Sequence, residues 1–456
     1  MIERELDKYI ENHYDTSKSA LMLTGARQTG KTFAIRKYAE TKGLNLVEIN
    51  FLENADAALI FKDVRDVSEI LLRLSAYAKR QLVSGKTLIF FDEVQKCPEV
   101  VTMIKFLVEE GSFIYALSGS LLGVELNDVR SVPVGYLNVK EVFPLDLCEF
   151  AKAVGISDEI IRHIAEAWKN QTPVDEVVHN SMLKLTLLYL MVGGMPAAVQ
   201  CYIDTNDMYA VQQKQKEIMT MYRWDISQYD LNRKLYIKEI FDLIPSELNA
   251  KNKRFILKNL NEHARFTRYE DSFLWLKDAG VALPTYNAEE PMFPLKLNAQ
   301  RNLFKLFLND VGLLASQYAD GTALRVLSGD VNINYGAIYE NLVAQELRIH
   351  GYDLYFFNSK KQGELDFVIE NDAEIIPIEV KSGKDYERHN ALKNVLDSSA
   401  YNIKKAYVFC NSNLNVRGNV IYAPIYMLMF IKRNVMSGNT IYKNDFANLK
   451  LKRNIS

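Results

Sequence analysis

The stretch GARQTGKT, from Gly25 to Thr32, decides the fold that the sequence predicts. It matches the spacing GxxxxGK[ST] in full, follows the apolar run ALML at 20–23 and opens the helical stretch TFAIRKYAE. A strand, a glycine-containing turn and a helix, in this order, form the context in which this spacing binds phosphate. Gly25 and Gly30 let backbone N–H groups curl around an anion, and the helix N-terminus adds partial positive charge. We therefore expect a phosphate-binding loop here.

The side chains of this loop predict a nucleotide and a metal ion. Lys31 is expected to reach the β- and γ-phosphates of ATP as a point charge, and Thr32 to offer its hydroxyl to Mg²⁺. The residues expected to contact the nucleotide from this loop are Gly25, Ala26, Arg27, Gln28, Thr29, Gly30, Lys31, Thr32 and Phe33.

A second motif, which contains two acidic residues, follows in LIFFDEVQ, residues 88–95. Four apolar residues predict a buried strand, and Asp92 and Glu93 come at its C-terminal end, where ligands bind in doubly wound sheets. Asp92 is expected to hold Mg²⁺ through water, and Glu93 to polarise the water that attacks the γ-phosphate. The next strand ends in LSGS, so Ser118 and Ser120 are expected either to sense the γ-phosphate or to serve as turn residues.

The pattern around both motifs predicts an α/β fold. Strand candidates alternate with helical stretches, which is typical of a parallel sheet covered on both faces. These strand candidates are residues 20–23, 44–51, 87–94, 112–118 and 136–142. We therefore assign residues 1–150 to one nucleotide-binding domain.

Three further parts are expected after this domain. Residues 151–229 show helical periods without an evident strand and predict a helical lid or linker. Residues 230–320 read as helices followed by a short hairpin, which indicates a winged-helix-like module or, equally, a helical spacer without a binding role. Residues 324–456 return to a mixed pattern and predict a smaller α/β domain.

The C-terminal part contains a second acidic constellation. In EIIPIEVKSG, Glu379 and Lys381 are two residues apart on a predicted strand and would project from the same face. A hairpin would bring Asp366, from GELDFVI, beside Glu379, and Glu340 on the preceding helix would complete the set. Two carboxylates and a lysine suit Mg²⁺ and a water directed at phosphate, with Asp366 and Glu379 as the ligands. The alternative is a strand held by ordinary ion pairs.

Composition excludes several classes of protein. The chain has 456 residues, too many for one ordinary core, and a formal net charge of -2, so no overall basic field indicates nucleic-acid binding. Its four cysteines show no CxxC spacing, which favours a reduced, cytoplasmic setting over a disulfide framework or a structural zinc site. The most apolar stretch, LTLLYLMVGGMPAAV, is broken by glycines and Pro196, so we expect no membrane span.

The ordered phrases LTGARQTGKT, LIFFDEVQ, LSGSLLG, PLDLCEF, YLMVGGMPAAV, FKLFLNDVGLL and YENLVAQEL resemble a family of prokaryotic AAA-type ATPases with a nuclease-like C-terminal domain. The resemblance implies an ATPase in which VGGMP places a lid near the nucleotide. The Asp366 and Glu379–Lys381 pattern, with Glu340, is similar to the restriction-endonuclease-like superfamily, with all four positions filled.

The same resemblance implies assemblies in which one subunit supplies an arginine to its neighbour's ATP. This sequence has Gly135–Tyr136 where the family has Gly-Arg, so Arg130 or Arg65 would have to substitute. A ring is therefore not implied, although an oligomer stays open.

Three functions follow as alternatives. The first is an ATP-driven switch or motor that controls a C-terminal nuclease-like effector. The second is a nucleotide-gated scaffold or regulator with a catalytically silent docking domain, and the third is an ATP-gated, metal-dependent nuclease. The expected ligands are ATP and Mg²⁺, and the expected partner is a nucleic acid or a protein.

Overall fold

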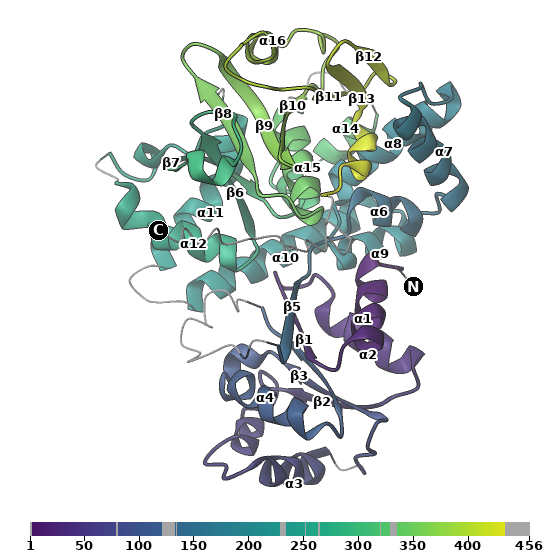
Figure 1. Cartoon of the computed structure of the whole chain (residues 1–456), viewed down its shortest axis with the longest axis vertical. Coiled ribbons are helices and arrows are strands. Elements are labelled where there is room, and N and C mark those ends of the chain that lie inside the picture. The colour runs from purple at the N-terminus through teal and green to yellow at the C-terminus, as the bar shows by residue number, and fades with distance from the viewer. Residues whose placement is uncertain are drawn as a thin grey trace, which may run out of the picture.

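The computed structural model describes residues 2–78, 81–120, 133, 135–228, 234–250, 252–262, 265–319, 321–328 and 335–433. Two β-sheets lie at opposite ends of the long axis of the molecule (Figure 1). The N-terminal sheet occupies the lower end in this view and the C-terminal sheet the upper end, with helices between them.

The N-terminal sheet is fully parallel, as the sequence predicts, and its strand order is β2-β3-β4-β1-β5. Its strands are β1 (Ala20–Thr24), β2 (Asn45–Asn50), β3 (Thr87–Asp92), β4 (Ile114–Ser118) and β5 (Leu137–Glu141). Because successive side chains point to opposite faces, Leu21 and Leu23 pack under one helical layer, and Ala20 and Met22 under the other. The first layer contains α1 (Glu5–Thr16) and α2 (Lys31–Thr41), and the second contains α3 (Val67–Ala78) and α4 (Glu99–Glu110).

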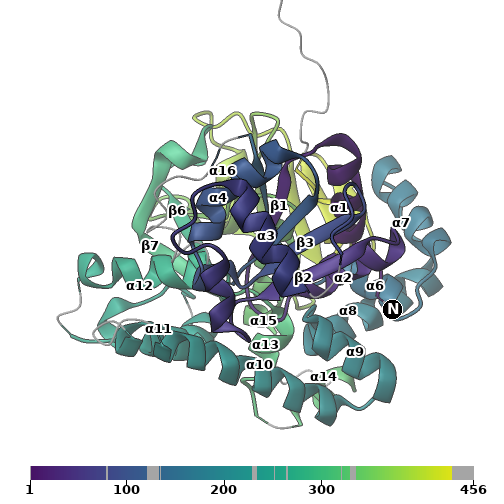
Figure 2. The ribbon, with the colours of Figure 1, turned by 90° about the horizontal axis from the view of Figure 1, so that it is seen from below.

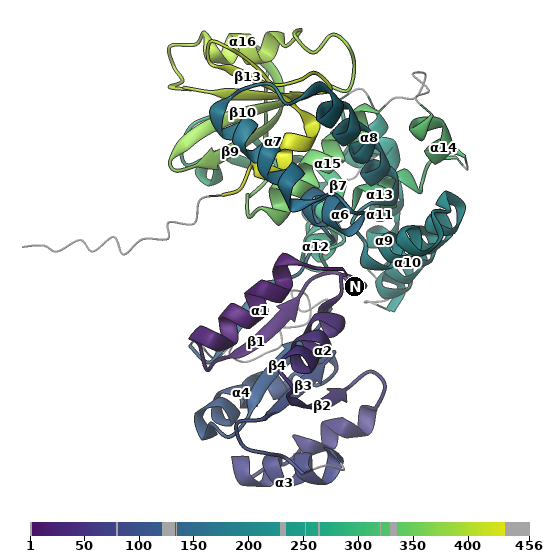
Figure 3. The ribbon, with the colours of Figure 1, turned by 90° about the vertical axis from the view of Figure 1, so that its right-hand side faces the viewer.

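A helical region follows, beginning where Asp146 accepts a hydrogen bond from the backbone of Glu149 and caps the first helix. Its helices are α6 (Leu147–Ala153), α7 (Asp158–Asn170), α8 (Glu176–Val192), α9 (Pro196–Thr205), α10 (Met208–Gln228), α11 (Lys234–Asn249) and α12 (Phe266–Asp278). Helices α10 and α11 lie along one side of the molecule (Figure 2), and in the side view α9 and α10 lie at the right-hand edge, at a height between the two sheets (Figure 3).

Among the described residues, no helix is by itself long and apolar enough to cross a bilayer. One pair, α8 and α9, passes by length and composition together, but it is bent by 119°. The side chains of this pair that are buried contribute to the large core described below.

The C-terminal sheet is mixed and has eight strands in the order β12-β13-β11-β10-β9-β8-β6-β7. These are β6 (Ala282–Ala288), β7 (Ala299–Leu308), β8 (Tyr355–Ser359), β9 (Gly363–Asn371), β10 (Glu374–Val380), β11 (Ala406–Cys410), β12 (Asn415–Arg417) and β13 (Val420–Pro424). The accompanying helices are α13 (Val311–Ala315), α14 (Thr322–Leu327), α15 (Gly336–Ile349) and α16 (Asn390–Leu396). Short 3₁₀ segments are Ala55–Ile60, Val94–Lys96, Leu257–Asn259, Leu295–Asn298 and Ile425–Phe430.

The hairpin expected in a separate winged-helix-like module belongs to this C-terminal sheet instead. Strand β6 pairs with β7 on one side and runs parallel to β8 on the other, with Tyr286 opposite Tyr355. The boundary predicted near residue 320 therefore does not divide two modules. A pairing partner about seventy residues away leaves no local trace in the sequence, which explains the difference.

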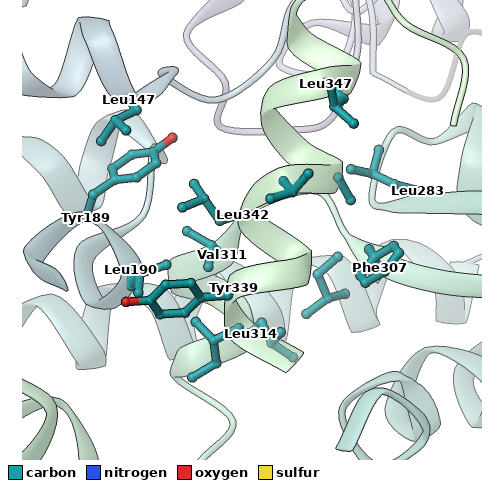
Figure 4. Close-up of a cluster of buried hydrophobic side chains, with 14 of the residues drawn as sticks. Leu147, Tyr189, Leu190, Leu283, Phe307, Val311, Leu314, Tyr339, Leu342 and Leu347 are labelled. Atoms are coloured by element: carbon teal, nitrogen blue, oxygen red, sulfur yellow. The ribbon is translucent and has the colours of Figure 1, made fainter. Parts of the chain in front are cut away.

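The helical region and the C-terminal sheet share one hydrophobic core. Figure 4 shows part of this core, where Tyr189 of α8 and Phe307 of β7 lie on either side of α15, the helix that carries Leu342. The cluster extends from Leu145 to Ile431 and includes Ala26 of the phosphate-binding loop. The three parts expected after residue 150 thus share this core.

Candidate nucleotide site

The loop between β1 and α2 has the backbone that two glycines permit. Gly25 has φ 113°, and a Cβ atom at this position would lie 2.3 Å from the carbonyl oxygen of Val142. Gly30 has φ 94° in the left-handed region and precedes the first residue of α2. Any larger residue at position 25 would clash with the backbone that follows β5, so the sequence motif has a steric cause.

Lys31 lies folded over this loop. Its Nζ donates hydrogen bonds to the carbonyl oxygens of Gly25, at 2.9 Å, and of Ala26, at 2.7 Å. Burial lowers the pKa of Lys31 to about 8, although Glu93 and Asp92 act in the opposite direction. The loop therefore holds a buried amine beside the two acids that the sequence placed in the same site.

Asp92 lies at the end of β3 and collects donors from its neighbours. The hydroxyl of Thr32 lies 3.1 Å from its Oδ2 atom, and Nδ2 of Asn50 lies 3.2 Å from the same oxygen. Ser118, at the end of β4, donates to Oδ1. Burial raises the pKa of the Asp92 carboxyl, while the Ser118 and Thr32 hydroxyls favour its charged form.

These oxygens suit Mg²⁺. The ion prefers hard oxygen ligands and keeps several waters, so one hydroxyl and one carboxylate are enough from the protein. Thr32 and Asp92 supply that pair side by side. The structure thus brings together the two ligands expected from the sequence.

Glu93 turns out of the sheet directly after β3, with φ 57° and ψ 47°. Its Oε2 atom accepts a hydrogen bond from Ser120 at 3.1 Å and another from Gln95. Ser118 and Ser120 were expected to meet the γ-phosphate or to form a turn. In the structure the hydroxyl of Ser118 donates to Asp92 and that of Ser120 to Glu93.

The remaining loop residues have different surroundings. Thr29 is buried and donates to the Ala26 carbonyl, whereas Gln28 is exposed and Phe33 is 53% exposed on α2. Arg27 is half-buried, and its guanidinium forms an ion pair with Asp225 at 2.7 Å. Of the arginines considered for a neighbouring subunit's site, Arg130 lies outside the described residues, and Arg65 is exposed just before α3, so this role stays a prediction for either residue.

Residues distant in sequence pack against the phosphate-binding loop. Arg4 donates to the carbonyl of Thr29 at 2.8 Å, and Tyr222 of α10 donates to that of Arg27 at 3.3 Å. A Cβ atom at Gly280, between α12 and β6, would lie 2.9 Å from the amide nitrogen of Ala26. A Cβ atom at Gly30 would lie 3.7 Å from Pro196, so VGGMP does reach the loop.

Sequence reasoning missed several of these contacts. Asn50 was open to prediction, since it ends β2 opposite Asp92 at the same edge of the sheet. Asp225 and Gly280 come from α10 and from the turn before β6, and no motif marks either of them. The structure therefore adds two parts that touch the phosphate-binding loop: helix α10 and the C-terminal body, meaning the eight-stranded sheet together with α13 to α16.

A cleft of about 660 Å³ lies between the two sheets, and its lining extends from Gly25 and Glu141 to Arg301 and Arg348. Its lining residues include neither Lys31 nor Thr32, Asp92 or Glu93. These four residues, which are expected to act on the nucleotide, therefore lie on the helix-α2 side of the loop rather than in this cleft.

The C-terminal acids do converge as the sequence predicts. Strands β9 and β10 form a hairpin through a turn at Asp372 and Ala373, both with positive φ. The Val380 amide donates to Asp366 Oδ2 at 2.9 Å, and Lys381 Nζ lies 2.7 Å from Glu379 Oε2. Burial and the neighbouring Asp366 raise the pKa of Glu379 to about 8.

Basic side chains already occupy this acidic cluster. Lys305 of β7 is fully buried and lies 3.5 Å from Glu340 Oε2 and 2.9 Å from Glu364 Oε1. Lys253 pairs with the other oxygen of Glu340, and Arg254 with Glu364 at 3.1 Å. Burial alone would lower the pKa of Lys305, but Glu340 and Glu364 outweigh it and raise that pKa above its usual value.

The acids of this cluster already have hydrogen-bond and ion-pair partners in the structure. Both oxygens of Glu340 already face lysine amines, and the Asp366 and Glu379 carboxylates have an amide and Lys381 as partners. Within the ranges that the structure describes, no group of three His, Cys, Asp or Glu side chains is arranged to hold a metal. Metal binding by Asp366 and Glu379 stays a prediction.

Family models match three segments of the chain. Residues 17–151 match the AAA domain, in agreement with the resemblance of this part to AAA-type ATPases. Residues 184–323 and 335–428 match two domains of unknown function, DUF8612 and DUF4143. No curated protein matches the sequence.

Three solved structures are among those that are similar to this chain, all at low identity. The Walker-type ATPase of Pyrococcus abyssi has 13% identity and a TM-score of 0.44, over 69% of this chain and 95% of that one. PCH-2 of C. elegans has 15% identity and a TM-score of 0.26, over 46% and 65%. CDC6P of Pyrobaculum aerophilum has 14% identity and a TM-score of 0.24, over 69% and 88%.

Proposed function

We propose that the chain binds and hydrolyses ATP with Mg²⁺, and that nucleotide state controls a C-terminal docking body. The observation that carries the proposal is the placement of the Thr32 hydroxyl 3.1 Å from the Asp92 carboxylate, beside the buried Lys31 and next to Glu93. These are the cation, metal ligands and acid that phosphoryl transfer to water uses.

In this proposal each residue has one task. Lys31 and the loop amides bind the β- and γ-phosphates, while Thr32 and Asp92 hold Mg²⁺, which when bound neutralises charge on the phosphate oxygens. Glu93 accepts the proton of the attacking water, because it follows directly after the metal-binding acid. Measuring phosphate release for the wild type and for variants at Lys31 and Glu93 tests the assignment, as detailed in the Discussion.

ATP affinity is expected to fall as the pH rises through about 8. The lowered pKa of Lys31 means that the amine loses its proton there, and the neutral amine no longer attracts phosphate. One unit above that pKa, binding should be weaker by about tenfold. Titration of a fluorescent ATP analogue with Mg²⁺ at pH about 7 and about 9.5 measures this. Lys31→Ala serves as control and should show a much smaller change; an equal change in both proteins contradicts the role of the amine.

Docking is the role that we assign to the C-terminal body. It shares its core with the helical region and touches Ala26 through Gly280, so a ligand bound there would sense the phosphate-binding loop. A nuclease role requires the carboxylates to be free for metal, but Lys381 already pairs with Glu379, and Lys305 and Lys253 pair with Glu340. The partner of the docking body, protein or nucleic acid, is left to experiment.

Lys305→Met is expected to destabilise the protein. Removing one member of a buried ion-pair cluster leaves uncompensated charge and costs about 3–5 kcal/mol, and Lys305 is fully buried. Chemical or thermal unfolding measures the loss. Lys404→Met is the matched control, since Lys404 pairs with Glu374 at the surface and is 65% exposed. Equal stability of the two variants would show that the buried lysine is not needed to neutralise the cluster.

Manganese titration of the wild type and of the double variant Asp366→Ala with Glu379→Ala distinguishes a docking role from nuclease chemistry. With ATP absent, the two proteins should bind the same amount of manganese, because we expect Asp366 and Glu379 to hold none. Binding that disappears in this double variant would restore the metal-dependent alternative.

A further inference from the structure

We propose that Arg27 is a positioning residue that makes the action of Glu93 depend on the placement of helix α10. The inference rests on the proposed ATPase function and adds its regulation. The path runs from Asp225 on α10, through Arg27 in the phosphate-binding loop and Ser120 after β4, to the carboxylate of Glu93.

The first contact joins the loop to the helix. Arg27 Nη1 lies 2.7 Å from Asp225 Oδ1, and the Asp225 side chain is only 6% exposed. Burial raises the pKa of Asp225, and the Arg27 guanidinium acts against this by favouring the charged carboxylate. A buried aspartate on a helix remote in sequence is therefore held next to the acids of the nucleotide site by one side chain of the loop.

The second contact extends this link toward Glu93. Arg27 Nε donates to Ser120 Oγ at 3.3 Å, and Gln95 Nε2 donates to the same oxygen at 3.3 Å. A serine hydroxyl has two acceptor positions and one proton. With two donors facing it, Ser120 has its single proton left for Glu93, whose Oε2 atom lies 3.1 Å away. The orientation of Ser120 is thus set by Arg27 and Gln95.

Gln95 supports this reading from the opposite side. Its amide nitrogen also donates to Glu93 Oε2, while its Oε1 atom is buried and has no hydrogen-bond partner. A reversed amide would point that oxygen at the Glu93 carboxylate and at the oxygen of Ser120. All donors that converge here therefore hold one oxygen of Glu93, and the other carboxylate oxygen is the one that we assign to water.

Helix α10 connects this path to the C-terminal body. Tyr222, one turn before Asp225, accepts a hydrogen bond at 3.3 Å from Asn309, which follows β7. Arg223 lies 3.4 Å from the side-chain oxygen of Gln317, after α13. A ligand that moves the C-terminal body would shift α10, withdraw Asp225 from Arg27 and release Glu93 from its position. This gives the docking role a route to the ATPase site.

The variant Arg27→Lys tests whether Arg27 must connect Asp225 with Ser120 or only has to supply a positive charge. Lysine keeps the positive charge toward Asp225, but its single ammonium cannot reproduce the two-sided fork that also reaches Ser120. The variant should keep its KM for ATP within about twofold and lose about tenfold in kcat, the size of one oriented hydrogen bond. Asp225→Asn should behave in the same way. Arg73→Lys, on α3, carries the same substitution at another ion pair and should leave kcat unchanged.

The double variant Arg27→Lys with Ser120→Ala tests whether the residues act in series. Its kcat should be no lower than that of the more affected single variant, because both changes interrupt one path. Multiplicative losses would indicate independent roles. If kcat and the melting temperature of Arg27→Lys both fall and its KM for ATP rises, Arg27 only stabilises the loop.

Trp224, next to Asp225, gives a readout that does not need turnover. It is 65% exposed on α10, so acrylamide quenching reports on the environment of this helix. A non-hydrolysable ATP analogue should change the quenching in the wild type, with Trp224→Phe as the control, and the change should shrink in Arg27→Lys. If the wild type binds and hydrolyses ATP, and Arg27→Lys has the same kcat and the same quenching as the wild type, the proposed path from Asp225 to Glu93 is wrong and the proposed function stands. Absence of binding of the fluorescent analogue to the wild type would overturn the proposed function and the relay with it.

Discussion

Glu93→Gln is expected to bind ATP as the wild type does and to lose turnover by about 100-fold or more, the contribution of a general base. The amide keeps the shape of the side chain and an oxygen that can accept from Ser120 and Gln95. It cannot take a proton from water. Phosphate release at saturating ATP measures turnover, and the fluorescent analogue measures binding.

The control for this variant is Glu11→Gln, the same substitution at an acid of α1 that pairs with Lys42 at the surface. Its phosphate release should match that of the wild type. If Glu93→Gln also releases phosphate at the wild-type rate, the base lies elsewhere and the assignment of Glu93 is wrong.

Lys31→Ala is expected to weaken ATP binding by about 100-fold, since a buried charge-assisted contact to phosphate contributes roughly 3 kcal/mol. Lys31 is 7% exposed, and its amine lies over the Gly25 and Ala26 carbonyls, where the loop turns. The measurement is a titration with the fluorescent analogue in the presence of Mg²⁺.

Because Lys31 also donates hydrogen bonds to the loop, the melting temperature of the Lys31→Ala protein has to be compared with that of Lys62→Ala, a change at an exposed lysine of the same domain. Loss of affinity in a protein that is still folded supports the phosphate-binding role. Equal affinities of Lys31→Ala and the wild type would remove the basis for the ATP site.

The N-terminal sheet was predictable because its information is local. Each of β1 to β5 is a short apolar or alternating run, and in a parallel sheet the C-terminal ends of such runs meet at one edge. This is why the sequence alone predicts that Thr32, Asp92 and Glu93 lie together. The same logic joined Asp366 to Glu379, since a hairpin turn and a two-residue period place them together.

Long-range pairing was not predictable in the same way. Strand β6 finds its parallel partner β8 across more than sixty residues, so the hairpin looked like part of a separate module. The sequence around Lys305 on β7 therefore carries no sign of its ion pairs with Glu340 and Glu364. A cluster of acids in a sequence suggests a metal, and only the fold reveals which cations already face those acids.

Contacts made through helix α10 had no signal at all. Asp225 belongs to an amphipathic helix with many polar residues, and nothing in its neighbours marks it as a partner of Arg27. Such a residue is found only when the helix is docked on the loop.

The most direct test of the central claim is the identity of the nucleotide that the protein retains. Wild type and Glu93→Gln are incubated with ATP and Mg²⁺, separated rapidly from free nucleotide, denatured and analysed by ion-exchange chromatography. The account predicts ADP on the wild type and ATP on Glu93→Gln. ADP in equal amounts on both proteins, or no nucleotide on either, would contradict it.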